Sequence, residues 1–189
     1  MTARRHLNPR PAIFLDRDGT IIRYVEVPKA PTDITLFKSS GPALRELKER
    51  GYLLIVVTNQ PIIEKGIITL RTAEQLNDVM QQQLKKFGAE VDAVYVCPHR
   101  FGTECRCRKP DIELIERAVK DFNIDLPLSW MVGDSTRDIE AGRRARLPTI
   151  LVKTGDGGTD TRFFTTTADY EARNLKNAAK IIMEHCPLP

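Results

Sequence analysis

The sequence predicts an α/β fold in which helices cover both faces of one parallel sheet, a doubly wound, three-layer arrangement of the Rossmann-like kind. Two observations favour this class. Short apolar runs alternate with amphipathic helical patterns along the chain, and acidic or polar clusters follow directly after several of the runs. In such sheets ligands gather beyond the carboxyl ends of the strands. We therefore expect the polar clusters to meet at one edge of the sheet.

The first elements follow from apolar runs and the residues that end them. Ala12 to Leu15 is apolar and stops at a polar run, which predicts the first strand. A helix is expected from Gly41 to Arg50, because Pro42 suits its first turn and leucines recur on one face. Tyr52 to Thr58 is apolar enough to predict a second, buried strand.

A longer helix is expected to start at Thr72. Thr72 together with Gln75 resembles a capping box, and Gly88 is typical of a helix C-terminus. One apolar stripe runs along this helix and is formed by Leu76, Val79, Met80, Leu84 and Phe87. The spacing of the stripe predicts a helix with one face in the core.

The second half of the chain continues the alternation of strands and helices. Strands are expected at residues 93–96, 130–132 and 149–152, and helices at residues 112–122 and 138–145. A loop rich in Gly and Thr, residues 154–167, is expected before a C-terminal strand and helix within residues 168–185.

Length and composition predict a single domain of residues 1–189 with a core from about residue 11 to residue 153. The 189 residues are 41% hydrophobic and 29% charged, which is typical of a globular protein. The longest apolar stretch, Tyr52 to Val57, is too short to cross a bilayer, and the N-terminal residues do not resemble a secretory signal. We expect a cytoplasmic monomer with no membrane partner.

The charge balance is basic but does not by itself indicate a partner. The net charge is +4 and the isoelectric point is near 8.9, yet the basic residues form no long run. Aromatic residues are few and scattered, so no platform for base stacking is predicted. We do not expect a nucleic-acid partner.

A pair of acids follows the first predicted strand. Asp16 and Asp18 are two residues apart, and the turn at Gly19 allows both carboxylates to converge on one point. One carboxylate can then attack phosphorus while the other exchanges a proton with the leaving oxygen. The alternative is a solvated Asp-Gly turn without chemistry.

A second acidic motif follows the strand expected at residues 130–132. Asp134 comes after Gly133 and would lie beside the end of the first strand, where it could bind Mg²⁺ together with Asp16, a carbonyl oxygen and waters. Asp138 has two interpretations that stay open. It contacts the metal, or it caps the helix that begins nearby.

Polar and basic residues at two further positions could hold a phosphate. Thr58, Asn59 and Gln60 end the second strand and could donate hydrogen bonds to phosphoryl oxygens, although such residues also simply terminate strands. Arg108 and Lys109 precede a helix, and Lys109 suits the negative charge of an attacking carboxylate beside a phosphate.

Three of the four cysteines lie close together in the sequence with a histidine. Cys97, His99, Cys105 and Cys107 supply a full Cys₃His set for Zn²⁺ in a closed, structural site. Such a site would pin the loop and fix the positions of Arg108 and Lys109 that follow it. The alternative is a chance cluster of reduced thiols.

Taken in order, these motifs resemble the four motifs of the haloacid-dehalogenase (HAD) superfamily of aspartate-nucleophile phosphatases. The matching segments are Asp16-x-Asp18-Gly-Thr20, Thr58-Asn59-Gln60, Lys109 and Gly133-Asp134-x-x-x-Asp138. The Cys-x-His-x₅-Cys-x-Cys-Arg-Lys-Pro segment is similar to that of the subfamily that contains heptose bisphosphate phosphatases and histidinol-phosphate phosphatases.

The resemblance implies an Mg²⁺-dependent phosphatase of HAD-like fold without a cap domain, because the gap between Thr20 and Gly41 is short. Asp16 would form an aspartyl-phosphate, and Asp18 would be the general acid and base with its backbone carbonyl on Mg²⁺. Asp134 would be the third protein ligand of Mg²⁺. The transferring phosphoryl group would be held by Thr58, Asn59 and Lys109. Arg108 would reach the rest of the substrate.

The resemblance also favours one substrate among small phosphorylated metabolites. Residues 58–66 and 151–155 are similar to the branch that removes the 7-phosphate of D-glycero-D-manno-heptose 1,7-bisphosphate, in lipopolysaccharide biosynthesis. One alternative is a histidinol-phosphate phosphatase, whose product amine would need an acid such as Glu26 or Glu64. The other is a polynucleotide 3′-phosphatase or a nucleic-acid-binding module, because such phosphatases share the fold.

Overall fold

A computed structural model of the chain describes residues 8–161 and 164–185, so the expected domain limits at residues 1 and 189 and the fourth cysteine, Cys186, lie outside the described residues. The described strands form one six-stranded parallel sheet in the order β3-β2-β1-β4-β5-β6. Their bounds are β1 Ala12–Leu15, β2 Leu53–Asn59, β3 Ala93–Cys97, β4 Trp130–Gly133, β5 Thr149–Val152 and β6 Tyr170–Ala172.

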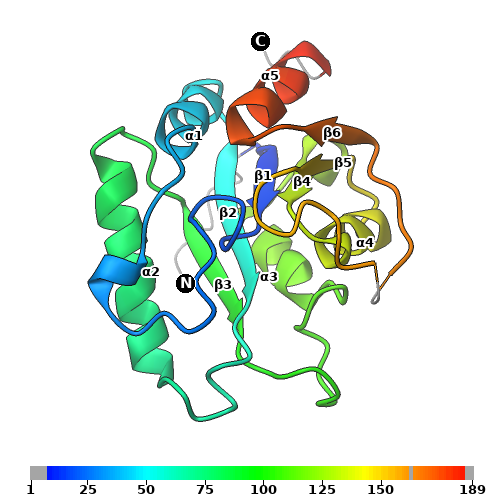
Figure 1. Ribbon diagram of the computed structural model, residues 1–189. Helices are drawn as coiled ribbons and strands as arrows, with labels where there is room; N and C mark the ends of the chain where they lie inside the picture. The colour runs from blue at the N-terminus through cyan, green and yellow to red at the C-terminus, as the bar shows by residue number, and fades with distance from the viewer. Residues whose placement is uncertain (1–7, 162–163, 186–189) are drawn as a thin grey trace, which may run out of the picture.

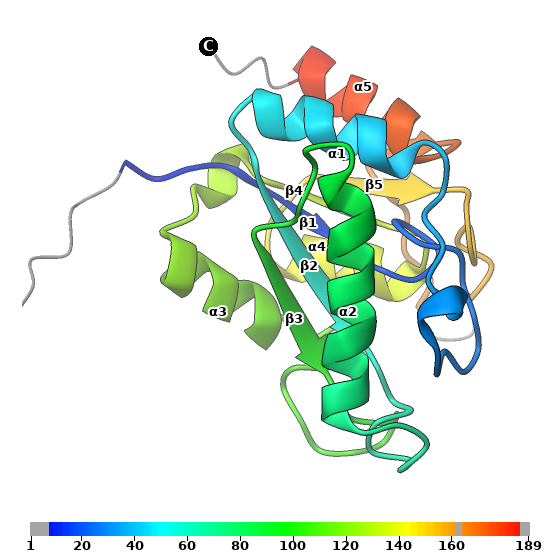
Figure 2. The same cartoon turned by 90° about the vertical axis from the view of Figure 1, so that its left-hand side faces the viewer.

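The helices lie on both faces of this sheet (Figure 1). Their bounds are α1 Ser40–Glu49, α2 Leu70–Lys85, α3 Glu113–Phe122, α4 Thr136–Arg144 and α5 Leu175–His185. Helices α1, α2 and α5 cover one face, and α3 and α4 cover the other. Figure 2, turned by 90°, shows α2 running beside β3 at the edge of the sheet. The predicted doubly wound, three-layer fold is confirmed.

Alternating side chains of the central strands build two separate apolar clusters. In β1, Ile13 and Leu15 pack into the cluster under α1, α2 and α5, whereas Ala12 and Phe14 pack into the cluster under α3. All four are fully buried, as expected for a parallel strand that is covered on both faces. This packing fixes where β1 ends, and so it fixes the position of Asp16 directly after it.

The start of α2 differs from the prediction. The helix begins at Leu70, and the side chain of Thr69 caps it by accepting a hydrogen bond from the Thr72 backbone N–H at 3.0 Å. The prediction that Thr72 and Gln75 form the capping box is therefore wrong. Thr69 offers the same side-chain oxygen three residues earlier in an extended backbone conformation, so the helix gains nearly one more turn.

The start of α4 also lies earlier than predicted. Ser135 is its N-cap, and Asp138 is the third residue of its first turn, in a capping box with Ser135. The other predicted bounds agree with the structure within two residues, and β6 and α5 confirm the C-terminal strand and helix.

Between β1 and α1 the chain forms loops and a single 3₁₀ turn at Pro31–Asp33, with no cap domain. Among the described residues, no helix combines the length and the apolar character needed to cross a membrane.

Candidate active site

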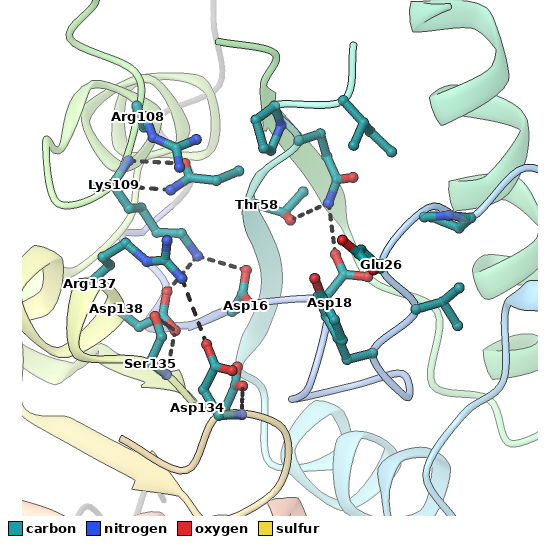
Figure 3. Close-up of a pocket in the computed structure, with 18 residues that line it drawn as sticks. Asp16, Asp18, Glu26, Thr58, Arg108, Lys109, Asp134, Ser135, Arg137 and Asp138 are labelled. Carbon is teal, nitrogen blue, oxygen red and sulfur yellow. Dashed lines mark hydrogen bonds and ion pairs between the residues drawn. The ribbon is translucent and has the colours of Figure 1, made fainter. Parts of the chain in front are cut away.

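An open cavity of about 180 Å³ lies at the carboxyl edge of the sheet, where β1, β2 and β4 end. Its floor includes Asp16, whose backbone N–H donates to the carbonyl oxygen of Val132 at 3.0 Å and so is fixed to the neighbouring strand. Figure 3 shows Arg108, Lys109 and Arg137 on one side of Asp16 and the acids Asp18 and Glu26 on the other. The cavity thus has a cationic wall and an acidic wall.

Lys109 is the central cation of the site. Its Nζ lies 2.7 Å from Asp16 Oδ1 and 2.6 Å from Asp138 Oδ1, and the lysine is 3% exposed. Asn59 fixes the lysine backbone: its side-chain oxygen accepts from the Lys109 N–H at 3.0 Å, and its amide N–H donates to the Lys109 carbonyl oxygen at 3.2 Å. In this geometry the amide of Asn59 positions Lys109 in addition to facing the cavity.

Burial and charge shift the titration of both partners. Burial raises the pKa of Asp16 to about 6, although the charge of Lys109 acts in the opposite direction. Burial also opposes the charge on Lys109, but the carboxylates of Asp138 and Asp16 outweigh it and raise the pKa of the lysine. At neutral pH the pair is therefore a carboxylate held by an ammonium group, as a nucleophile requires.

Asp134 follows β4 and is held from two directions. The hydroxyl of Thr20 donates to its Oδ1 at 3.1 Å, and the backbone N–H of Asp156 donates to its Oδ2 at 2.7 Å. Both Gly19 and Gly155 have positive φ and lie so close that a Cβ on either would collide with this carboxylate. Burial, and then the charges of Asp16 and Asp138, raise the pKa of Asp134 to about 8.

Three carboxylates meet closely enough to hold a cation. One oxygen from each of Asp16, Asp134 and Asp138 lies within 4.8 Å of the others. Both oxygens of Asp138 already have protein donors, since Oδ1 binds Lys109 and Oδ2 accepts from the Ser135 N–H at 3.0 Å and its hydroxyl at 2.9 Å. Of the two interpretations of Asp138, the structure supports a helix cap that also binds Lys109.

Asp18 faces away from this acidic cluster. Its carboxylate accepts from Arg17 Nε at 3.0 Å and from Gln60 Nε2 at 2.7 Å, and Gln60 in turn donates to the Thr58 hydroxyl at 3.0 Å. The structure thus brings Asp16 and Asp18 to one cavity on different sides, as Figure 3 shows. A proton donor and a nucleophile that flank one point can act on opposite ends of a breaking bond.

Two guanidinium groups form the cationic wall beside Lys109. Burial, and second the charge of Arg137, lower the pKa of Arg108. Figure 3 shows both side chains on the same side of the cavity. Arg108 Nη1 donates to the His99 carbonyl oxygen at 2.9 Å, and Arg137 lies 3.8 Å from a carboxylate oxygen of Asp156 and 3.6 Å from one of Asp160. Neighbouring cations of this kind favour an anionic ligand.

The four predicted zinc ligands come together beside this wall. One atom from each of Cys97, His99, Cys105 and Cys107 lies within 4.8 Å of the others, and Cys97 Sγ lies 3.1 Å from Cys107 Sγ. Three thiols and an imidazole fit the tetrahedral Cys₃His set of a structural zinc site. The loop that carries them also carries the His99 carbonyl oxygen that holds Arg108.

Glu64 was considered as an acid near the substrate, but it does not line the cavity. Its carboxylate accepts from the Arg100 backbone N–H at 2.6 Å and from the Thr103 hydroxyl at 2.9 Å, so it binds the loop that carries the zinc ligands. The Glu64 carboxylate is exposed. The hydrogen bond from the Arg100 backbone N–H is the main cause that lowers the pKa of Glu64. Of the two acids considered for an amine substrate, only Glu26 lines the cavity.

Sequence reasoning missed Arg137, Asp156 and Tyr24, all of which line the cavity. Arg137 could have been found, because it lies in the first turn of the helix that starts at the carboxyl edge of the sheet. Asp156 follows β5 at the same edge, but a loop rich in Gly and Thr gave no pattern that marks one acid. Tyr24 is an isolated aromatic residue, and nothing in its neighbours indicates a cavity.

The chain is similar in sequence to known phosphatases. A family model described as HAD-hydrolase-like matches residues 106–178. The chain is 38% identical over 152 residues to the D-glycero-beta-D-manno-heptose-1,7-bisphosphate 7-phosphatase of Haemophilus ducreyi, covering 76% of this chain and 84% of that protein. It is 34% identical over 142 residues to a probable D-glycero-D-manno-heptose-1,7-bisphosphate 7-phosphatase of Thermoplasma volcanium, covering 75% of this chain and 97% of that protein.

A solved structure gives the same result. The crystal structure of D,D-heptose 1,7-bisphosphate phosphatase from B. bronchiseptica, complexed with magnesium and phosphate, superposes with a TM-score of 0.84 at 28% identity. The match covers 93% of this chain and 99% of that chain, so the similarity extends over the whole fold.

Proposed function

We propose a specific activity for this chain on the premise that it belongs to the family of HAD-like phosphatases that includes the D-glycero-D-manno-heptose-1,7-bisphosphate 7-phosphatases. The proposed reaction is removal of the 7-phosphate of D-glycero-D-manno-heptose 1,7-bisphosphate. The observation that carries the proposal is the carboxylate of Asp16, held at 2.7 Å by the buried Lys109 on the floor of an open cavity. A carboxylate in this position is a nucleophile with its charge partner already in place.

The reaction proceeds in two displacements. Asp16 attacks phosphorus, the bond from phosphorus to the sugar oxygen breaks, and Asp18 gives its proton to that oxygen. Water then attacks the aspartyl-phosphate and passes a proton to Asp18, and the bond from phosphorus to Asp16 breaks. The products are the sugar monophosphate and inorganic phosphate, and both carboxyl groups return to their starting state.

The residues around the acids fit Mg²⁺. Asp16 and Asp134 offer carboxylate oxygens to one point, and oxygen ligands of this kind are what Mg²⁺ prefers. Asp18 would add its backbone carbonyl oxygen, as the family resemblance implies. When bound, Mg²⁺ supplies positive charge that offsets the charge of the phosphate. Lys109 adds a second positive charge, and Thr58 is placed to donate a hydrogen bond to a phosphoryl oxygen.

The cationic wall supports a substrate with a second phosphate. Arg108 and Arg137 line the same cavity as Asp16, whereas the ion pair with Asp16 comes from Lys109. A bisphosphate could therefore place one phosphate at Asp16 and the other at the two guanidinium groups, which bind phosphate through paired N–H donors. A monophosphate would place no phosphate at this wall.

The cysteine cluster supports a structural zinc ion. Zn²⁺ would be held by Cys97, His99, Cys105 and Cys107, with no position left for a reacting water. Its proposed effect is to stiffen the loop whose His99 carbonyl oxygen orients Arg108. Because reduced thiols are needed for such a site, we also propose that the protein works in the cytoplasm.

A phosphate-release panel tests the substrate. The heptose bisphosphate, the matching heptose monophosphates and histidinol phosphate would be compared with Mg²⁺ present. We expect the highest kcat/KM for the bisphosphate, because only that substrate can use both Asp16 and the pair of arginines. A higher kcat/KM for histidinol phosphate would overturn the proposal, and Glu26 in the cavity would then be the acid that receives its amine.

Replacement of the nucleophile tests the chemistry. We expect Asp16→Asn to lower kcat by at least about 10⁴-fold, because an amide cannot form the aspartyl-phosphate. Asp121→Asn is the matched control, since Asp121 lies on α3 and contacts Tyr95 away from the cavity. Near-normal turnover by Asp16→Asn, measured in a protein with unchanged circular dichroism, would rule out Asp16 as the nucleophile.

A further inference from the structure

Arg17 lies between the two reactive acids in the sequence, yet it does not line the cavity. Its side chain is 1% exposed, and it is the largest of the fully buried side chains among the described residues. We propose that Arg17, anchored to helix α2 through Asn77, is a positioning residue that fixes the proton-transferring carboxylate of Asp18. The inference rests on the function proposed above, in which Asp18 gives a proton to the leaving oxygen.

The position of Arg17 needs an explanation because burying a charged side chain is costly. A well-packed apolar residue of similar size would often be neutral or stabilising at such a site. Arg17 instead reaches from the end of β1 toward the face that α2 covers, between Asp16 and Asp18, which line the cavity. A guanidinium group retained there has a task that an apolar side chain cannot perform.

The contacts of Arg17 with Asp18 form a two-pronged grip. Arg17 Nε donates to Asp18 Oδ2 at 3.0 Å, and Arg17 Nη2 donates to Oδ1 at 3.1 Å and lies 2.8 Å from Oδ2. Gln60 adds a third donor to Oδ2 at 2.7 Å. A planar guanidinium that binds both oxygens fixes the orientation of the carboxylate as well as its place.

The grip leaves the two oxygens of Asp18 unequal. Oδ2 receives hydrogen bonds from both Arg17 and Gln60, whereas Oδ1 receives one, from Arg17. A carboxylate oxygen accepts up to about two hydrogen bonds, so Oδ1 keeps a lone pair that can carry the proton which Asp18 gives to the leaving oxygen. The geometry assigns the proton transfer to Oδ1, and the three donors prevent the carboxylate from turning away from the leaving oxygen.

Asn77 anchors the far side of the guanidinium group. Arg17 Nη1 donates to Asn77 Oδ1 at 2.8 Å, and Asn77 is a buried polar residue on the core-facing side of α2, next to Leu76. The helix therefore holds the arginine, and the arginine holds the acid. Among the described residues Asn77 is not part of the cavity lining, and its bond from Arg17 links it to the site, so we expect any effect of Asn77 on the reaction to pass through Arg17.

The test compares leaving groups. An alkyl phosphate such as the heptose bisphosphate needs a proton on its leaving oxygen, whereas p-nitrophenyl phosphate releases a stable anion and needs none. The constant kcat/KM includes only the steps up to release of the leaving group, so it reports this first proton transfer. A residue that positions Asp18 should matter for one substrate and not for the other.

We expect Arg17→Met to lower kcat/KM for the heptose bisphosphate about 100-fold, and kcat/KM for p-nitrophenyl phosphate less than about threefold. Arg17→Lys keeps the charge without the two-pronged grip, so we expect it to restore little of the loss. Asn77→Ala should give the same selectivity at about tenfold. Leu76→Ala, on the same helix, is the matched control and should change the two constants by equal factors.

The outcomes separate this inference from the proposed function. Equal losses on both substrates, or full rescue by Arg17→Lys, would overturn the positioning role of Arg17. If Arg17→Met fails to fold by circular dichroism, Asn77→Ala decides: a selective loss supports the inference and an unselective one overturns it. Failure of the proposed function would instead be seen in the wild-type protein, as no turnover of the heptose bisphosphate while p-nitrophenyl phosphate is still cleaved.

Discussion

Lys109 contributes to stability as well as to chemistry. Its ammonium group lies between Asp16 and Asp138, and the latter also caps the first turn of α4. Lys109 is 3% exposed and Asp138 is 1% exposed, so little solvent screens this pair. Removal of one member of such a pair leaves an uncompensated buried charge, which costs more than the pair itself contributes.

We therefore expect Lys109→Met to lower the free energy of unfolding by about 3 kcal/mol at neutral pH, in addition to abolishing activity. The double variant Lys109→Met with Asp138→Asn should recover part of that loss, because it removes the uncompensated charge and keeps an acceptor for the helix cap. Urea unfolding followed by circular dichroism measures both. A loss below about 1 kcal/mol in the single variant, or no recovery in the double, would contradict this account.

Single residues also show where sequence reasoning succeeds and where it ends. Asp16 and Asp134 could be identified because each follows a strand, and the position of a strand end depends mainly on local pattern. Arg17 and Asn77 could not be paired, because their contact joins residues that only the packing of α2 on the sheet brings together. Neither residue carries a spacing signal of its own.

The segment from β3 to α3 connects the proposed zinc site to the cavity. It runs from Cys97 to Glu113, and its fixed points are the four metal-ligand candidates, the bond from Arg108 to the His99 carbonyl oxygen, and the bonds from Asn59 to Lys109. Without the cluster, the segment has no regular secondary structure to hold it. The cluster thus replaces secondary structure as the support of two cations.

Loss of zinc should therefore affect substrate binding more than the fold. We expect Cys107→Ser to lower the zinc content from about one ion per chain to well below half. It should also raise KM for the heptose bisphosphate more than tenfold, because Arg108 loses its fixed position. Arg106→Ala is the matched control, since Arg106 is an exposed residue of the same loop and not a ligand candidate. Elemental analysis and steady-state kinetics provide the readouts, and an unchanged KM in a zinc-free protein would contradict the role given to the loop.

At the level of elements, the order and type of helices and strands were predictable, while two helix starts were not. The error at α2 arose because Thr69 and Thr72 both suit an N-cap, and the choice between them depends on the path of the preceding loop. At α4, Asp138 was taken as the first helical residue, although it belongs three residues inside as the partner of Ser135. In both cases the sequence contained suitable capping residues, but it did not show at which residue the helix begins.

The whole molecule gathers six acids at one end of the sheet. One cavity is lined by Asp16, Asp18, Glu26, Asp134, Asp138 and Asp156, and burial raises the pKa of Asp16 and of Asp134. Neither Lys109 nor Arg17 offsets this charge completely. The folded protein therefore holds these carboxyl groups where burial makes ionisation costly, at the place where a cation and a phosphate are proposed to bind.

A pH dependence of stability follows from these shifts. In the unfolded chain the acids ionise near 3.8, whereas in the folded protein Asp16 keeps its proton to about 6 and Asp134 to about 8. Between these limits the folded state binds more protons than the unfolded state, so the stability of the magnesium-free protein should fall as pH rises. Mg²⁺ binds the ionised carboxylates, and its stabilising effect should grow over the same range.

Thermal unfolding at several pH values from 5 to 8, with and without added Mg²⁺, measures this effect. We expect the increase in Tm that Mg²⁺ produces to be larger at pH 8 than at pH 5, with uptake of Mg²⁺ releasing protons. NaCl at matched ionic strength provides a comparison for general ionic effects. An increase in Tm that is independent of pH would mean that the acids are already ionised without the metal.

The order of the sheet places β1 between β2 and β4, and β4 is formed from residues far along the chain. Synthesis on the ribosome runs from the N-terminus, so Asp16 emerges long before Lys109, Asp134 and Asp138 exist. A nascent chain therefore carries its nucleophile without the ammonium group that holds it or the acid that shares its cation. Fragments released before β4 and α4 are translated will be inert toward phosphate esters, and hydrolysis can begin only once both halves of the sheet have joined.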